Sequence, residues 1–205
     1  MDVFVKICGI ASLSDLVEVA ALKPDALGFV LWDGSPRNVQ PDDLVNWLRL
    51  VPTAAVKVGV FVNPDPKTAM DIARRAGLDA IQLHQVESLA PYDIAGVRVW
   101  RAVYAERMRK PAVERGRVDA YVADTYSKSA PGGTGMVGNW EAVRHLVQTT
   151  ATPVLLAGGL NPRNVREALH AVNPWGVDVS SGVEERPGRK DINRVREFIQ
   201  QCRTA

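Results

Sequence analysis

Two residues near the N-terminus have a spacing that could support acid–base chemistry. Lys6 and Cys8 lie two positions apart in the apolar run Val3–Cys8, so in a strand their side chains project from the same face. A cysteine alone is most often a small buried apolar residue, but a neighbouring ammonium favours the thiolate. The pair therefore predicts an activated thiolate base or nucleophile, with Lys6 in a supporting role.

A carboxylate stands at the end of another apolar run. Asp124 follows Tyr121-Val122-Ala123 and precedes residues 125–138, which carry no helix or strand pattern. A long connection in a compact domain is usually a lid or a binding loop. This one contains Gly132-Gly133-Thr134-Gly135, whose glycines let backbone N–H groups approach a ligand. Asp124 therefore has two interpretations, a helix cap or a functional carboxylate beside a binding loop.

Two short turns follow the seventh and eighth apolar runs. They are Gly158-Gly159 and Ser180-Ser181-Gly182. In barrels of alternating strands and helices, the loops after strands 7 and 8 commonly hold phosphate through backbone N–H groups. Tight turns alone would also explain the glycines, but their occurrence at both positions favours a phosphate site.

Other polar residues stand at or beyond the ends of apolar runs. Arg37 follows Ser35-Pro36 and is either a solvated surface charge or a planar fork for a carboxylate. Gln82 and His84 end the fourth run, and Asp178 lies in the eighth. His84 has no companion Cys or carboxylate at metal-ligand spacing, so we expect no metal site.

These residues must be positioned by a regular succession of strands and helices. Eight apolar runs recur along the chain, most of them apolar at consecutive positions, which is typical of parallel strands covered on both faces. They are Val3–Cys8, Ala26–Leu31, Ala55–Val62, Ala80–His84, Val97–Val103, Ala120–Asp124, Pro153–Ala157 and Gly176–Ser180.

Helix patterns with start signals separate the runs. Capping side chains precede amphipathic stripes at Ser12, Asp65, Asn139, Asn161 and Asp191. The weakest helix pattern is Val86–Ile94, which is short and contains a proline. Eight β/α units allow a closed barrel or a doubly wound open sheet. The G-x-G-x-x-G fingerprint of dinucleotide binding is absent after the first run, so we predict an α/β fold, a single (β/α)8 TIM barrel over residues 1–205.

Composition narrows the class of protein. The chain has 205 residues, two cysteines and a formal net charge of +2. Few cysteines favour a reducing compartment, and no apolar run reaches the roughly 18 residues of a membrane helix. Scattered basic residues do not indicate nucleic-acid binding. We therefore expect a cytoplasmic protein, either a monomer or a homodimer, with no nucleic-acid or membrane partner.

Taken together, the motifs resemble the phosphoribosylanthranilate isomerase family of tryptophan biosynthesis. Each motif is weak alone, but the six occur in order over nearly the whole chain, with Gln85 standing where the family usually has glycine. They are Lys6-Ile7-Cys8-Gly9, Ser35-Pro36-Arg37, Gln82-Leu83-His84, Asp124 with Gly132-Gly133-Thr134-Gly135, Leu156-Ala157-Gly158-Gly159-Leu160 and Asp178-Val179-Ser180-Ser181-Gly182-Val183-Glu184.

The resemblance implies a cofactor-free Amadori rearrangement of N-(5-phosphoribosyl)anthranilate, an anionic phosphorylated small molecule, to an aminoketose. Asp124 would be the general acid that protonates the furanose oxygen, and Cys8 the general base that removes the C2 proton. Arg37 would bind the anthranilate carboxylate, Gln82 and His84 would contact substrate, and Asp178 would bind a sugar hydroxyl or pair with Lys6. The expected phosphate contacts are Gly133, Thr134, Gly158, Gly159, Ser180 and Ser181.

Three alternatives remain at this point. A related isomerase of histidine biosynthesis uses paired aspartates, against which the combination of Cys8 and Asp124 argues. An indole-glycerol phosphate synthase would need catalytic Lys and Glu residues that we do not find. A non-catalytic phosphosugar-binding barrel would bind ligand without turnover, and a fluorescence assay with the labile substrate distinguishes it from an enzyme.

Overall fold

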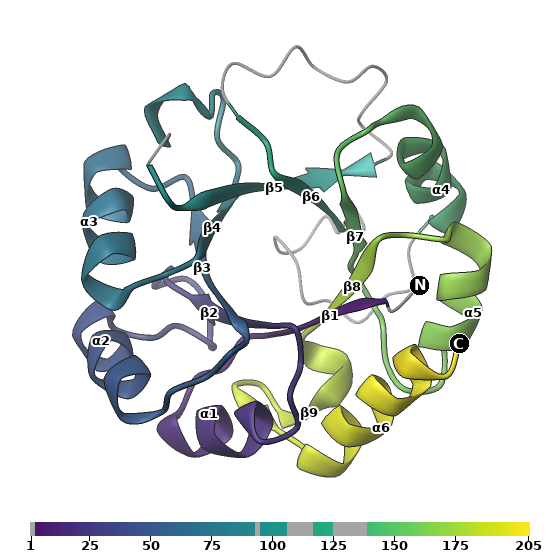
Figure 1. Ribbon diagram of the computed structural model, residues 1–205, viewed down its shortest axis with the longest axis horizontal. Helices are drawn as coiled ribbons and strands as arrows, with labels where there is room; N and C mark the ends of the chain where they lie inside the picture. Colours follow the sequence, from purple (N-terminus) through teal and green to yellow (C-terminus); the bar gives the residue numbers. More distant parts are fainter. Residues whose placement is uncertain (1–2, 93–94, 106–116, 125–138) are drawn as a thin grey trace.

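Eight parallel strands close into a barrel, which confirms the predicted fold class. The computed structural model describes residues 3–92, 95–105, 117–124 and 139–205. Neighbouring strands pair in chain order and β1 pairs with β8 to close the ring (Figure 1). The strands are β1 Phe4–Cys8, β2 Ala26–Val30, β3 Val56–Val62, β4 Ala80–His84, β5 Arg98–Tyr104, β6 Ala120–Asp124, β7 Val154–Leu156 and β8 Gly176–Val179.

Helices surround the barrel on the outside (Figure 1). Four predicted caps are confirmed, because the side chains of Ser12, Asp65, Asn139 and Asp191 each accept a backbone N–H of the first turn. No helix in the described part of the chain is long and apolar enough to cross a membrane. The α-helices are α1 Leu13–Ala20, α2 Pro41–Leu50, α3 Pro66–Ala76, α4 Trp140–Thr149, α5 Val165–Val172 and α6 Ile192–Arg203.

One predicted helix begins later than expected, and another is wrong. The helix expected after Asn161 begins at Val165, with Asn164 as its N-cap residue. The Asn164 side chain instead bonds the Asn161 amide and the Gly159 carbonyl, so the first asparagine belongs to a turn. A helix was expected over Val86–Ile94, of which the structure describes residues 86–92. These form only the 3₁₀ turn η1, Ala90–Tyr92, because a proline within so short a segment removes a helical N–H donor.

The core has two layers, one inside the barrel and one between the barrel and its helices. Small residues leave room inside the barrel for Trp100, which is 1% exposed. Phe4 packs edge-on against Trp100 and stacks on Trp175 with ring centroids 4.3 Å apart. These aromatic rings fill the end of the barrel at which the strands begin. The inner layer consists of Ala26, Val58, Ala80, Trp100, Ala120, Val122, Leu155 and Ala157.

Three aspartates repeat along the edge at which the strands begin. Asp25, Asp79 and Asp119 each directly precede an even-numbered strand. Each accepts a backbone N–H of the preceding odd-numbered strand at 2.7 or 2.8 Å. Each also pairs with a cation, from Arg203, Lys57 and Arg117 respectively. The carboxylates therefore fasten neighbouring strands together at this edge.

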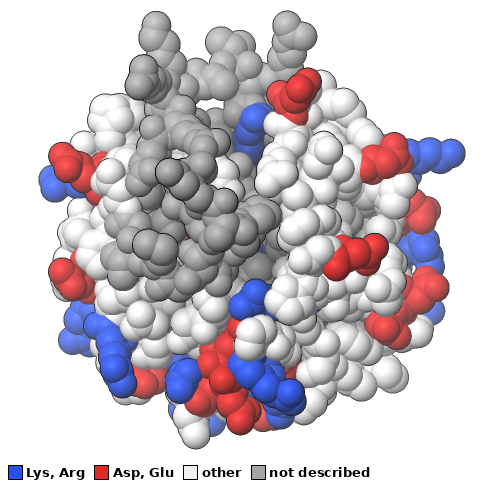
Figure 2. Space-filling view, turned by 180° about the vertical axis from the view of Figure 1, so that it is seen from behind, with Lys and Arg blue, Asp and Glu red and all other residues white. Residues whose placement is uncertain are grey.

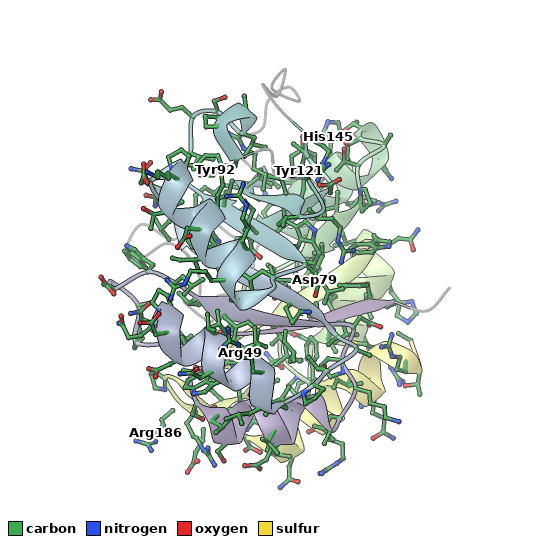
Figure 3. The ribbon with its side chains drawn as sticks, turned by 60° about the vertical axis from the view of Figure 1, so that its left-hand side comes forward. Arg49, Asp79, Tyr92, Tyr121, His145 and Arg186 are labelled. Carbon is green, nitrogen blue, oxygen red and sulfur yellow. The ribbon has the colours of Figure 1, made fainter. Side chains whose placement is uncertain are left out.

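A hairpin follows β8 that the sequence analysis did not predict. After the 3₁₀ turn η3, Ser181–Val183, the strands β9, Glu184–Arg186, and β10, Arg189–Lys190, pair antiparallel and lead into α6. Its tip contains Pro187-Gly188, residues that favour a turn. Figure 3 shows Arg186 of the hairpin and Asp79 of the strand-start edge toward opposite ends of the barrel.

Candidate active site

A cavity of about 410 Å³ opens at the end of the barrel where the strands finish. Its volume is in the range of small-molecule sites, and its position is the usual one for barrel enzymes. Gly133 and Thr134 lie outside the described residues. The cavity brings together the other expected substrate contacts and catalytic residues, namely Cys8, Arg37, Gln82, His84, Asp124, Gly158, Gly159, Asp178, Ser180 and Ser181.

Lys6 lies next to the cavity and pairs with Asp178. The register of β1 against β8 aligns the two residues, and Nζ lies 2.9 Å from Oδ1. Lys6 is fully buried, and its positive charge acts on the neighbouring Cys8. Gly28 on β2 leaves room for the Cys8 and Lys6 side chains, because a Cβ there would lie 2.7 Å from the Cys8 Sγ and 3.1 Å from the Lys6 Cε. The sequence analysis did not single out this glycine.

Lys6 favours the Cys8 thiolate, as expected, but burial outweighs its effect. Burial raises the pKa of the Cys8 thiol above its usual range, and the positive charge of Lys6 offsets only part of that rise. Asp178 adds a further upward contribution because its negative charge disfavours a thiolate nearby. Cys8 is therefore mainly the thiol at neutral pH, with Lys6 limiting the rise in its pKa.

Gln82 and His84 form a neutral polar pair on β4. The Gln82 Nε2 lies 2.9 Å from the His84 Nε2. Burial and the positive charge of Lys6 lower the pKa of His84 to about 4, so the imidazole is uncharged at neutral pH. The buried Oε1 of Gln82 has no hydrogen-bond partner among the described residues, and both side chains line the cavity. The pair is suited to hydroxyl or amine groups of a ligand.

The turns after β7 and β8 touch one another at the cavity. Gly158 and Gly159 have φ angles of 84° and 66°, a left-handed conformation that favours glycine. A Cβ at Gly182 would lie 1.8 Å from the Leu160 carbonyl oxygen, so the second turn approaches the first too closely for any side chain. Both turns therefore need their glycines for their own geometry, which fits a phosphate site and tight turns alone equally well.

Arg37 is locked by a residue to which the sequence analysis gave no role. Its Nε and Nη2 donate to the two carboxylate oxygens of Glu184 at 2.8 and 2.7 Å, a bidentate geometry. Burial acts to raise the pKa of Glu184, but the Arg37 hydrogen bonds and the neighbouring Lys190 outweigh it and lower that pKa. The spacing of Glu184 and Lys190 matches no known functional motif. Only the Pro-Gly turn between them could have suggested a hairpin.

No group of three His, Cys, Asp or Glu side chains comes together as a metal site would require, within the part of the chain that the structure describes. At the cavity, Lys6 pairs with Asp178 and Arg37 pairs with Glu184. Acidic and basic side chains are also interspersed over the described surface visible in Figure 2. The chemistry available in the described cavity is that of a thiol, a carboxyl group and a neutral imidazole.

Comparisons with known proteins agree with this site. The family model described as N-(5'phosphoribosyl)anthranilate (PRA) isomerase matches residues 5–201. A relative of that name from Geobacter sulfurreducens is 43% identical over 97% of this chain and 98% of its own. The crystal structure of the Thermotoga maritima protein superposes with a TM-score of 0.87 at 35% identity, over 99% of this chain and all of that one.

A second solved structure contains a ligand. It is phosphoribosyl anthranilate isomerase in complex with reduced 1-(o-carboxyphenylamino)-1-deoxyribulose 5-phosphate, 34% identical, with a TM-score of 0.84 over 99% of this chain and all of that one. The matches extend over nearly the whole chain at an identity that shows common family membership. This chain therefore belongs to the N-(5'-phosphoribosyl)anthranilate isomerase family of enzymes.

Proposed function

We propose that this chain catalyses the Amadori rearrangement of N-(5'-phosphoribosyl)anthranilate to 1-(2-carboxyphenylamino)-1-deoxyribulose 5-phosphate in tryptophan biosynthesis. The observation that carries the proposal is the position of Cys8 and Asp124, which line one cavity from β1 and β6, on different walls of the barrel. With a general acid and a general base on two sides of a bound sugar, the acid can donate a proton to the sugar and the base can remove another from it.

In this mechanism Asp124 gives a proton to the furanose ring oxygen. The bond between that oxygen and C1 breaks, and the ring opens to a Schiff base with the anthranilate nitrogen. The thiolate form of Cys8, whose share Lys6 increases, then takes the proton from C2, which leaves an enolamine that tautomerises to the ketone. The product is an isomer of the substrate, so no oxidant or cofactor enters the balance.

The two ends of the substrate carry negative charge, and the cavity offers a receptor for each. We assign the phosphate to the Gly158-Gly159 and Ser180-Ser181 turns, whose backbone N–H groups can donate to it. We assign the anthranilate carboxylate to Arg37. Asp178 is engaged by Lys6, so its second oxygen is the one that could accept a sugar hydroxyl.

A turnover assay tests the proposal. The anthranilate fluorescence of the substrate should decay in the presence of the protein, at a rate proportional to enzyme concentration. Tight binding without turnover would support the non-catalytic barrel instead. Arg37→Met should raise KM more than it lowers kcat, because a carboxylate clamp binds ground state and transition state alike. An equal fall in kcat and kcat/KM would contradict that role.

The oligomeric state, monomer or homodimer, and the cytoplasmic location stay predictions. An expected single domain over residues 1–205 is consistent with one closed barrel. Size-exclusion chromatography with light scattering, with and without inorganic phosphate, distinguishes the two oligomeric states.

A further inference from the structure

The guanidinium proposed to receive the substrate carboxylate is already bound to a carboxylate. Arg37 uses Nε and one Nη on Glu184, which leaves Nη1 and part of Nη2 for a ligand. An arginine and a glutamate in bidentate contact sum to zero charge. A neutral pair attracts a second carboxylate weakly, since the near field of the cation is cancelled by the anion beside it.

Lys190 lies behind this pair and restores its charge. Its Nζ lies 2.9 Å from Oε1 of Glu184, and the side chains of both residues are almost completely buried. Arg37, Glu184 and Lys190 thus form a chain of two cations and one anion, with a net charge of +1. Of the three residues, only Arg37 lines the cavity, and its side chain is 13% exposed.

The hairpin holds Lys190 firmly in this place. Its backbone N–H donates to Asp15 Oδ2 at 3.0 Å, from α1. Its ammonium also donates to the Ser180 carbonyl at 3.2 Å, at the start of the phosphate turn. Arg194 of α6 donates to the Glu184 carbonyl at 2.7 Å. A buried lysine with so many partners is costly to desolvate, and a purely apolar residue would fill the same space at less expense.

We propose that Lys190 is a positioning residue that acts through Glu184, fixing the Arg37 fork and giving the chain the net positive charge that selects a carboxylate on the aromatic end of the substrate. The inference rests on the proposed function, in which Arg37 meets that carboxylate. Lys190 itself does not touch the substrate. Its effect is therefore specific to ligands that carry the carboxylate, which a merely structural role would not be.

Two ligands separate these roles. One is reduced 1-(o-carboxyphenylamino)-1-deoxyribulose 5-phosphate, and the other is the same compound with hydrogen in place of the carboxylate. The dissociation constant of the ligand without the carboxylate, divided by that of the ligand with it, isolates the carboxylate contribution. Both constants are measured by calorimetry. Any change at the Ser180 turn or in overall folding affects both ligands equally and cancels in this ratio.

Lys190→Met should reduce the ratio by about 10- to 100-fold, because it leaves the Arg37–Glu184 pair neutral. Arg186→Met removes an exposed cation from the same hairpin and should leave the ratio as in the wild type. The double variant Glu184→Gln/Lys190→Met returns the net charge to +1, so the ratio should recover much of the loss. A purely structural lysine predicts no recovery.

The outcomes divide cleanly. A wild-type ratio near one would show that no carboxylate clamp exists, and the assignment of Arg37 in the proposed function would fail. A large wild-type ratio that Lys190→Met leaves unchanged would overturn the inference about Lys190 alone. If Lys190→Met does not fold, Glu184→Gln and the double variant are compared instead. The ratio should then fall about tenfold when Lys190 is lost, and equal ratios would overturn the inference.

Discussion

The two ends of the barrel use the same kinds of residue for different purposes. Where the strands begin, Asp25, Asp79 and Asp119 accept backbone amides and pair with partly exposed cations. Where the strands finish, Asp178 and Glu184 are nearly buried and bind the buried cations Lys6 and Lys190. The first arrangement joins strands to each other, and the second keeps charge beside a cavity. This division between stability and chemistry is expected of such barrels.

The largest effect expected at the site end is on turnover. Cys8→Ala and Asp124→Ala should each lower kcat by about 10²- to 10⁴-fold, the usual contribution of a proton-transfer group. The midpoint of chemical denaturation should change little in both. Steady-state kinetics on purified variants provide the measurement, and a kcat near that of the wild type would end the role assigned to that residue.

The site end should also be the acid-sensitive end. The folded state holds the pKa of His84 at about 4, below its ordinary value of 6.5, so between these two values the unfolded chain binds the proton and the folded chain does not. Stability is therefore complete above pH 6.5 and declines as the pH falls toward 4. The loss is at most about 3 kcal/mol, because solvent in the adjoining cavity screens the ring.

Unfolding free energies of the wild type and His84→Asn between pH 4 and 7 measure this contribution as a difference. The wild type should lose stability more steeply than the variant. His145→Asn, which removes an exposed imidazole from α4 (Figure 3), serves as the control and should run parallel to the wild type. Parallel curves for all three proteins would show that His84 is protonated equally easily in both states.

At the strand-start end, Asp79→Ala should lower stability by about 1–2 kcal/mol and leave kcat/KM at 25 °C unchanged. The reason is that the amide of Lys57 loses its acceptor. Asp71→Ala breaks only the exposed pair with Arg75 on α3 and should change stability by less than about 0.5 kcal/mol. Urea unfolding of both variants measures the two stability losses. They would be equally small if Asp79 acted through its ion pair alone.

The smallest effect concerns backbone strain. Gln85, just beyond β4, and Lys23, before β2, have φ angles of 57° and 55°, a conformation that is unfavourable for residues other than glycine. Gly substitution at either position should raise stability by up to about 1 kcal/mol. Only Gln85→Gly should also alter kcat/KM, since it follows His84 directly. An equal kcat/KM in the two variants would show that Gln85 has no more influence on the site than Lys23 has.

The sequence predicted the barrel because burial on both faces forces apolar runs, and every predicted strand limit lies within one residue of the structure. It did not predict the β9–β10 hairpin, whose residues are mostly charged and give no apolar pattern. Strand-end positions located Cys8 and Asp124. The pairing of Lys6 with Asp178, 172 positions away, was one of two roles that the resemblance implied for Asp178. The partner of Arg37, 147 positions away, was not predicted, because that contact depends on closure of the barrel and on the hairpin, which no local pattern encodes.

The hairpin also bears on how the protein is made. A chain under synthesis on the ribosome releases Lys6 and Arg37 well before Asp178, Glu184 and Lys190. Until then the two early cations lack the carboxylates that hold them, and the barrel cannot close because β8 is missing. The Arg37 fork and the turn after β8 are therefore completed together, once β8 and the hairpin have been synthesised.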